Sequence, residues 1–156
     1  MLETPHVAVG AAIATKVGNP YLALPLALLS HFVMDKVPHW NPHLNQDLDK
    51  EGKVKRKSAN FNLVLVDSVT ALTLGTALAS RALPESTTKA AIILAGCFLA
   101  VLPDVVEAPH YFFGIRHPWM NKFIAWQKSI QSDTTPFWGF ITQSVAIIAS
   151  LAWIFS

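Results

Sequence analysis

Residues 21–40, "YLALPLALLSHFVMDKVPHW", form an apolar run that ends in a group of titratable side chains. His31, Asp35 and His39 follow one another at four-residue steps. Four residues bring an α-helix back to nearly the same face, one turn further along. Ionisable groups are costly in an apolar environment and usually mark function there. The stretch therefore predicts a buried helix that ends at a polar site.

The composition of the whole chain is that of a membrane protein. The 156 residues are 52% hydrophobic and 14% charged, whereas soluble domains carry roughly 25% charged residues. The mean hydropathy is +0.38. Residues 47–57 hold eight of the 22 Lys, Arg, Asp and Glu residues. Such clustering is typical of a polytopic membrane protein, and a net charge of +2 is too small to indicate nucleic-acid binding.

The hydropathy pattern predicts an all-α fold, a polytopic integral membrane helical bundle with four or five membrane-embedded helices. We expect a single membrane domain, 1–156, with helices at about 5–17, 20–36, 60–80, 88–106 and 137–155. The first two are shorter than the ~20 residues of a full span, so they form a hairpin or end at a buried polar site. No cleavable signal peptide is evident.

Two other segments connect these helices. Residues 37–58 are a charged loop, and residues 107–136 interleave aromatic and basic side chains as interfacial segments do. Both are richer in Lys and Arg than the 81–87 loop, which carries only Arg81. The positive-inside rule therefore predicts a multi-pass protein of the cell membrane with the 37–58 loop in the cytoplasm. The same basic loop is suited to contact anionic lipid headgroups.

Depth along the helices brings the ionisable residues to one membrane face. If the first two helices are antiparallel about the turn at 18–20, His6 and His31 each lie ~17 Å from that turn. Asp35 is one turn beyond His31, and Asp67 lies ~10 Å into the third helix. Asp104 is near the end of the fourth helix, on the same side. Five titratable residues from four segments therefore converge.

Two imidazoles and three carboxylates at one place are best explained by metal binding. Such ligands suit zinc, manganese or iron, and three carboxylates exceed the need of one structural zinc. We expect one or two divalent ions, with zinc as the first candidate. The expected ligands are His6, His31, Asp35, Asp67 and Asp104. Asp67 is either a ligand or the general base. His39 follows Pro38 in the loop and is expected to assist catalysis at the rim.

The stretch "PDVVEAPH" at 103–110 contains two further candidate ligands. Glu107 lies three residues after Asp104, and His110 lies three residues after Glu107. A carboxylate followed by His at this spacing occurs in carboxylate-bridged metal sites. Pro109 argues against one continuous helix through the motif. His110, like His117, is more typical of an interfacial histidine than of a ligand.

Structural roles compete with these assignments. His31 and Asp35 have the spacing of a simple helical pair, and the carboxylate of Asp67 has Asn60, Asn62 and Ser68 as alternative hydrogen-bond partners. The lone cysteine, Cys97, lies in an apolar run and is expected to be a small buried side chain.

Four features of the chain resemble the YdjM-like family of predicted membrane-bound metal-dependent hydrolases. They are "TPHVAVGAA" at 4–12, "SHFVMDKVPHW" at 30–40, an aspartate in the next span and "LPD" at 102–104. The resemblance covers residues 4–110 and implies that His6, His31, Asp35, His39, Asp67 and Asp104 are the candidate ligands. There is a looser likeness to zinc-dependent phospholipase C, which rests on ligand types alone.

These features favour a metal-dependent hydrolase that acts on a phosphoester of a lipid or lipid-like substrate near headgroup depth. Its partners would be membrane lipids and a lipid-phosphate substrate, without nucleic acid, and the sequence leaves the oligomeric state open. One alternative is a metal-ion or proton transporter or channel, whose path would be lined by the same residues. Another is a non-enzymatic membrane assembly subunit.

Overall fold

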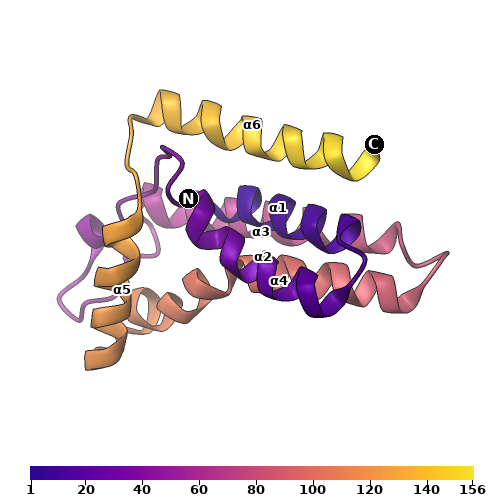
Figure 1. The fold of residues 1–156 in the computed structure, drawn as a ribbon. Coiled ribbons are helices and arrows are strands. Elements are labelled where there is room, and N and C mark those ends of the chain that lie inside the picture. Colours follow the sequence, from indigo (N-terminus) through magenta and orange to yellow (C-terminus); the bar gives the residue numbers. More distant parts are fainter.

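The computed structural model describes residues 1–156 as an all-α protein (Figure 1). Six α-helices and one short 3₁₀-helix follow in the order α1 (Glu3–Lys16), α2 (Pro20–Met34), η1 (Leu44–Asp47), α3 (Ala59–Ser80), α4 (Thr87–Phe113), α5 (Pro118–Ile130) and α6 (Pro136–Phe155). In Figure 1, the axes of α1, α2, α3, α4 and α6 share one general direction, and α5 crosses one end of the bundle. The N-terminus and the 37–58 loop lie at that same end.

Local signals explain where the helices begin. The side chains of Asn19, Ser58 and Ser86 each accept a hydrogen bond from a backbone N–H in the first turn of α2, α3 and α4. Such caps satisfy donors that the helix itself leaves unpaired. Proline at the first position of α2, α5 and α6 supplies a backbone angle already suited to a helix. Gly114 ends α4 in the left-handed conformation.

Helix α1 is the centre of the bundle and packs against α2, α3, α4 and α6. Most of its residues are small, and nine of the 14 are buried. Its closest neighbour is α4. A Cβ atom at Gly10 would lie 2.6 Å from the Gly96 carbonyl oxygen and 2.7 Å from the Ala100 Cβ. Only glycine permits the two backbones to approach this closely.

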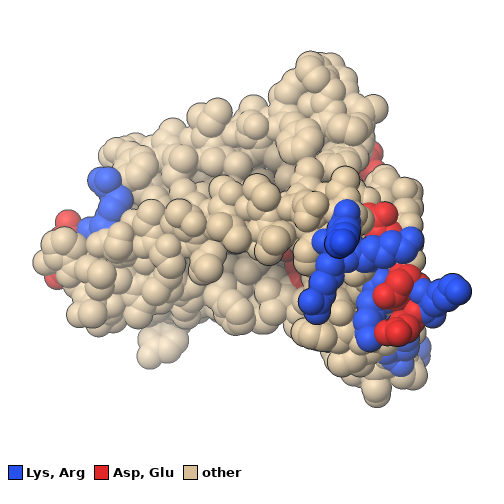
Figure 2. Space-filling model, turned by 180° about the vertical axis from the view of Figure 1, so that it is seen from behind, with Lys and Arg blue, Asp and Glu red and all other residues tan.

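Helices α3, α4 and α6 are long and apolar enough to cross a membrane. Their outward faces carry large exposed hydrophobic side chains, including Leu72, Phe98 and Ile148. Figure 2 shows that the charged side chains gather mainly at one end of the molecule, with a smaller group at the other and an uncharged band between them. A surface with this distribution matches a hydrocarbon layer bounded by water on both sides.

The helix boundaries agree with the predicted ones except in α4 and the segment after it. The prediction that this helix ends at 106 is wrong, because α4 continues through Pro103 and Pro109 to Phe113. Apolar packing around a helix allows such prolines where an isolated helix would break. Residues 118–130 of the predicted interfacial segment form an additional helix, α5. The charged loop contains the short η1.

The crossing of α1 and α4 predicts that one added methyl group at Gly96 destabilises the protein. A Cβ there would lie 2.7 Å from the Ala14 Cβ and 3.0 Å from the Gly10 carbonyl oxygen, and neither atom belongs to a flexible side chain. We expect Gly96→Ala to lower the stability by about 1–3 kcal/mol, although alanine favours helix formation. Thermal unfolding in detergent measures this effect.

Ala91→Val adds bulk at an exposed position of the same helix and should leave the unfolding temperature nearly unchanged. A Gly96→Ala variant as stable as the wild type would contradict the close crossing.

Candidate metal site

A buried group of three ligand-type side chains joins three helices at the charged end of the bundle. His6 comes from α1, His31 from α2 and Asp104 from α4. One ligand atom from each residue lies within 4.8 Å of those of the other two. Both histidines are fully buried, and the Asp104 side chain is 22% exposed. The three residues form a group whose geometry can hold a metal ion.

The His31 ring is oriented by the backbone of α4. Its Nδ1 donates a hydrogen bond to the Ala100 carbonyl oxygen at 2.8 Å. Because a carbonyl oxygen only accepts, the neutral ring keeps its lone pair on Nε2. That atom lies 3.5 Å from Asp35 Oδ2 and 3.7 Å from Asp104 Oδ1. A histidine held in this way is prepared to bind a metal through Nε2.

His39 has the same arrangement although it lies in the loop after Pro38. Its Nδ1 donates to the Val37 carbonyl oxygen at 2.8 Å, and its Nε2 lies 3.7 Å from Asp35 Oδ1. Burial lowers the pKa of His39, and the positive charge of the amino terminus lowers it further. The lowered pKa favours the neutral ring, whose Nε2 accepts a hydrogen bond from the Asn41 side-chain amide at 3.2 Å.

A short pairing between two distant segments fixes this loop. His39 donates its N–H to the Ser132 carbonyl oxygen at 3.0 Å and accepts from the Thr134 N–H at 2.9 Å. The Ser132 N–H donates to the Asp35 carbonyl oxygen at 3.0 Å. The segment after α5 thus holds both Asp35 and His39, which explains why Pro38 does not turn His39 away from the site.

Asp35 lies at the centre of the polar contacts and is fully buried. Its Oδ1 accepts a hydrogen bond from the Met1 amino group at 2.7 Å, and its Oδ2 accepts one from Gln131 Nε2 at 3.1 Å. Burial acts to raise the pKa of Asp35, but the adjacent His6 ring and the amino-terminal charge outweigh it and hold the pKa below its usual range. The carboxylate is therefore ionised.

His6 is a fully buried histidine whose two ring nitrogens have no hydrogen-bond partner. Its ring stacks on that of His31, with centroids 4.1 Å apart. Its Nε2 lies 3.4 Å from Asp35 Oδ1 without the alignment of a hydrogen bond. An unpaired buried polar group costs about 1–3 kcal/mol. Coordination of a cation would remove this cost.

Asp67 lies at the same end of the bundle but has a different set of partners. Its carboxylate accepts hydrogen bonds from the Glu3 N–H at 2.5 Å and from the Thr4 hydroxyl at 2.6 Å. It thereby caps the first turn of α1, a contact typically worth about 1 kcal/mol. The three alternative partners considered from the sequence, Asn60, Asn62 and Ser68, make no hydrogen bond with it.

The remaining candidates are spread around this centre. Glu107 is one helical turn beyond Asp104 on α4, and one of its carboxylate oxygens is buried without a partner. His110 contacts the Arg116 guanidinium instead of the His31 group. His43 is exposed in the loop, and His117 caps the start of α5.

Three residues of the site were not among those predicted from the sequence. Gln127 donates from Nε2 to Asp104 Oδ1 at 2.7 Å and also contacts His31 Nε2 at 3.2 Å. Gln131, the residue that directly follows α5, donates to Asp35. The carboxylate of Glu3 has a buried oxygen without a partner. The four-residue spacing of the glutamines was the only available signal, since amides do not stand out by charge.

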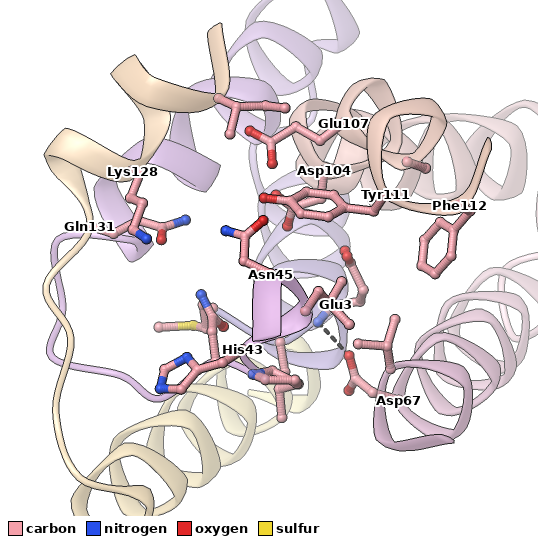
Figure 3. A pocket seen from close by; sticks show the side chains of 18 of the residues that line it. Glu3, His43, Asn45, Asp67, Asp104, Glu107, Tyr111, Phe112, Lys128 and Gln131 are labelled. Carbon is pink, nitrogen blue, oxygen red and sulfur yellow. Dashed lines mark hydrogen bonds between the residues drawn. The ribbon is translucent and has the colours of Figure 1, made fainter. Parts of the chain in front are cut away.

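A cavity of about 360 Å³ lies beside the buried group. Figure 3 shows Glu3, Asp67, Asp104 and Glu107 along one side of it and Lys128 and Gln131 across from them. Tyr111 and Asn45 also line the space. Lys128 is the only Lys or Arg among the lining residues, against five carboxylates. Asp104 belongs both to the buried group and to the cavity wall, so a molecule in the cavity reaches the ligand-type residues.

The arrangement combines buried imidazoles, carboxylates and an adjoining polar cavity. Neutral histidine and carboxylate are the ligand forms that divalent zinc, manganese and iron require. The geometry thus supports metal binding next to a space for a small polar group. In comparisons with models of known families, with characterised proteins and with solved structures, no match to this chain is found.

Proposed function

We propose that the protein is a membrane-embedded, metal-dependent hydrolase that acts on a phosphoester of a lipid. The observation that carries the proposal is the buried group of His6, His31 and Asp104 beside a polar cavity, at one end of a bundle with candidate membrane spans. The sequence resemblance to YdjM-like hydrolases points to the same activity. The site would open to the cytoplasmic side, where the basic loop is expected.

The chemistry of the residues supports a resident divalent cation, with zinc as the first candidate. His6, His31 and Asp104 would hold it, and Asp35 lies beside both histidines, 3.4 Å from His6 Nε2 and 3.5 Å from His31 Nε2. The unpartnered ring of His6 is the strongest structural reason for a cation there. A bound cation would supply Lewis acidity to a phosphoester oxygen and make water more acidic.

The cavity residues suggest how a phosphoester would be bound and attacked. Lys128 would orient the phosphate by its charge. Glu107 is the better general base, because one carboxylate oxygen is buried without a partner and is close to Asp104 along the helix. Asp67, the base suggested by the sequence, already accepts hydrogen bonds from the start of α1. We therefore assign Asp67 the role of positioning α1, and with it His6.

The hydroxyl groups in the other half of the bundle argue against a transport path. The hydroxyls of Thr70, Thr73 and Thr76 each donate to a backbone carbonyl oxygen within α3. All three residues are exposed on the outer face of that helix. They are thus satisfied locally and do not extend the polar site across the bundle. A function confined to one end is more consistent with a hydrolase than with a channel.

Metal analysis tests the first part of the proposal. We expect the detergent-purified protein to contain about one zinc or similar divalent ion per chain, and His31→Ala to lose most of it because a directed ligand is removed. His117→Ala, which changes an exposed histidine, should retain the metal. Elemental analysis of the three proteins measures this directly. Equal metal content in wild type and His31→Ala would overturn the site.

An activity assay tests the catalytic assignment. We expect Glu107→Gln to reduce kcat for phospholipid hydrolysis by about 10²–10³-fold, as removal of a general base does, without loss of metal. Glu85→Gln provides the control, because Glu85 is an exposed residue between α3 and α4. Release of the phosphorylated headgroup from lipid nanodiscs gives the rate. An unchanged kcat in Glu107→Gln would remove Glu107 from the reaction.

A further inference from the structure

A second hollow lies next to the polar cavity and is mainly apolar. It has a volume of about 300 Å³, and 11 of its 16 lining residues are hydrophobic. It lies between α3 and α4, with α1 behind it. Val7, Ala71 and Cys97 form its buried floor, and Leu72 and Phe98 are exposed at its edges. We refer to this hollow as the α3–α4 groove.

The groove and the polar cavity lie side by side and share part of their walls. Five residues line both of them: Glu3, Val64, Asp104, Ala108 and Phe112. Asp104 is among them, so the groove begins beside the candidate metal ligands. A molecule that occupies both spaces must be polar at one end and apolar along the rest of its length.

The dimensions of the groove suit one hydrocarbon chain. Along α3 it extends from Val64 to Thr76, which is ~18 Å at 1.5 Å per residue. Half of a ~30 Å hydrocarbon core is ~15 Å, so the groove has about the depth of one leaflet.

The groove is also open on the side that would face lipid. Leu72 is 69% exposed and Phe98 is 53% exposed, on two helices that are candidates to cross the membrane. A chain can therefore enter sideways from the bilayer and does not have to pass through water. The hydroxyl of Thr76, at the deep end, is already bonded within α3. No unsatisfied hydroxyl at this end opposes an apolar occupant.

We propose that the α3–α4 groove binds one acyl chain of a phospholipid whose phosphate lies in the adjoining polar cavity. This inference rests on the proposed function and specifies its substrate class as a long-chain phospholipid of the leaflet at the charged end. The chain in the groove holds the headgroup phosphate against Asp104 and its neighbours. The binding energy of the apolar tail thereby positions the ester for attack.

Two threonines of α3 provide matched variants. Thr76 lines the groove at its deep end, whereas Thr73 does not line it. Both are exposed, and each hydroxyl donates to the carbonyl oxygen four residues earlier. Thr76→Phe would fill the deep end of the groove, and Thr73→Phe would add the same ring on the surface. Neither substitution touches the ligand-type residues.

The test uses full-length protein in nanodiscs of phosphatidylglycerol that carries a photoreactive diazirine at the end of one sixteen-carbon chain. We expect cross-links at the groove residues Leu94, Phe98 and Val101, found by mass spectrometry. Thr76→Phe should reduce them about tenfold, because it displaces the last methylene groups, and Thr73→Phe should leave them unchanged. Cross-links spread evenly over α3, α4 and α6 would overturn the inference, as would cross-links from a polyprenyl phosphate probe alone.

Hydrolysis kinetics give a second and separate readout. Thr76→Phe should lower kcat/KM about tenfold for phosphatidylglycerol with sixteen-carbon chains and leave it unchanged for six-carbon chains. Equal loss for both substrates, or no loss for either, would overturn the acyl-chain assignment while leaving a hydrolase in place. Groove-specific cross-links in a protein that hydrolyses no phosphoester would support the lipid site and overturn the proposed function instead.

Discussion

The close crossing of α1 and α4 at Gly10 and Gly96 is the constraint on which the rest of the structure depends. Because no side chain separates the two backbones there, α1 packs directly on α4 and also contacts α2, α3 and α6. The same crossing positions Ala100, whose carbonyl oxygen orients the His31 ring. The packing of α1 on α4 and the orientation of the candidate ligand His31 therefore depend on the same part of α4. A protein with a wider crossing would separate His6 from His31 and Asp104.

The electrostatics of the site favour a bound cation. Asp35 is a fully buried carboxylate, and several further carboxylates lie around the adjoining cavity. Removal of each charge from water costs several kcal/mol unless it is paired. The side-chain amides of Gln127 and Gln131 and the amino terminus supply hydrogen bonds to Asp104 and Asp35, but His6 has no hydrogen-bond partner. A divalent ion would offset both costs, and its binding energy would then contribute to the stability of the fold.

The sequence predicted the all-α class, the end of the bundle at which the polar residues gather, and the equal depth of His6 and His31 along their helices. It could do so because depth along a helix depends only on residue count. The partners of Asp67 were not predictable in this way, since depth does not say which neighbour a side chain faces. The extent of α4 was missed because Pro109 stops helices in water more strongly than in a packed bundle. The position of α5, and with it Gln127, required the tertiary structure.

The location of the polar cavity argues for chemistry at the membrane surface. In a bilayer crossed by α3, α4 and α6, water and charged headgroups would reach this end of the bundle, and carboxylates there would be less costly than at the bilayer centre. A hydrolase needs such access to water, yet its lipid substrate must remain in the hydrocarbon. The shared wall of the cavity and the α3–α4 groove would meet both requirements, because Asp104 lines both the polar and the apolar space. A transporter would instead need polar groups beyond this junction, where the groove is lined mainly by hydrophobic side chains.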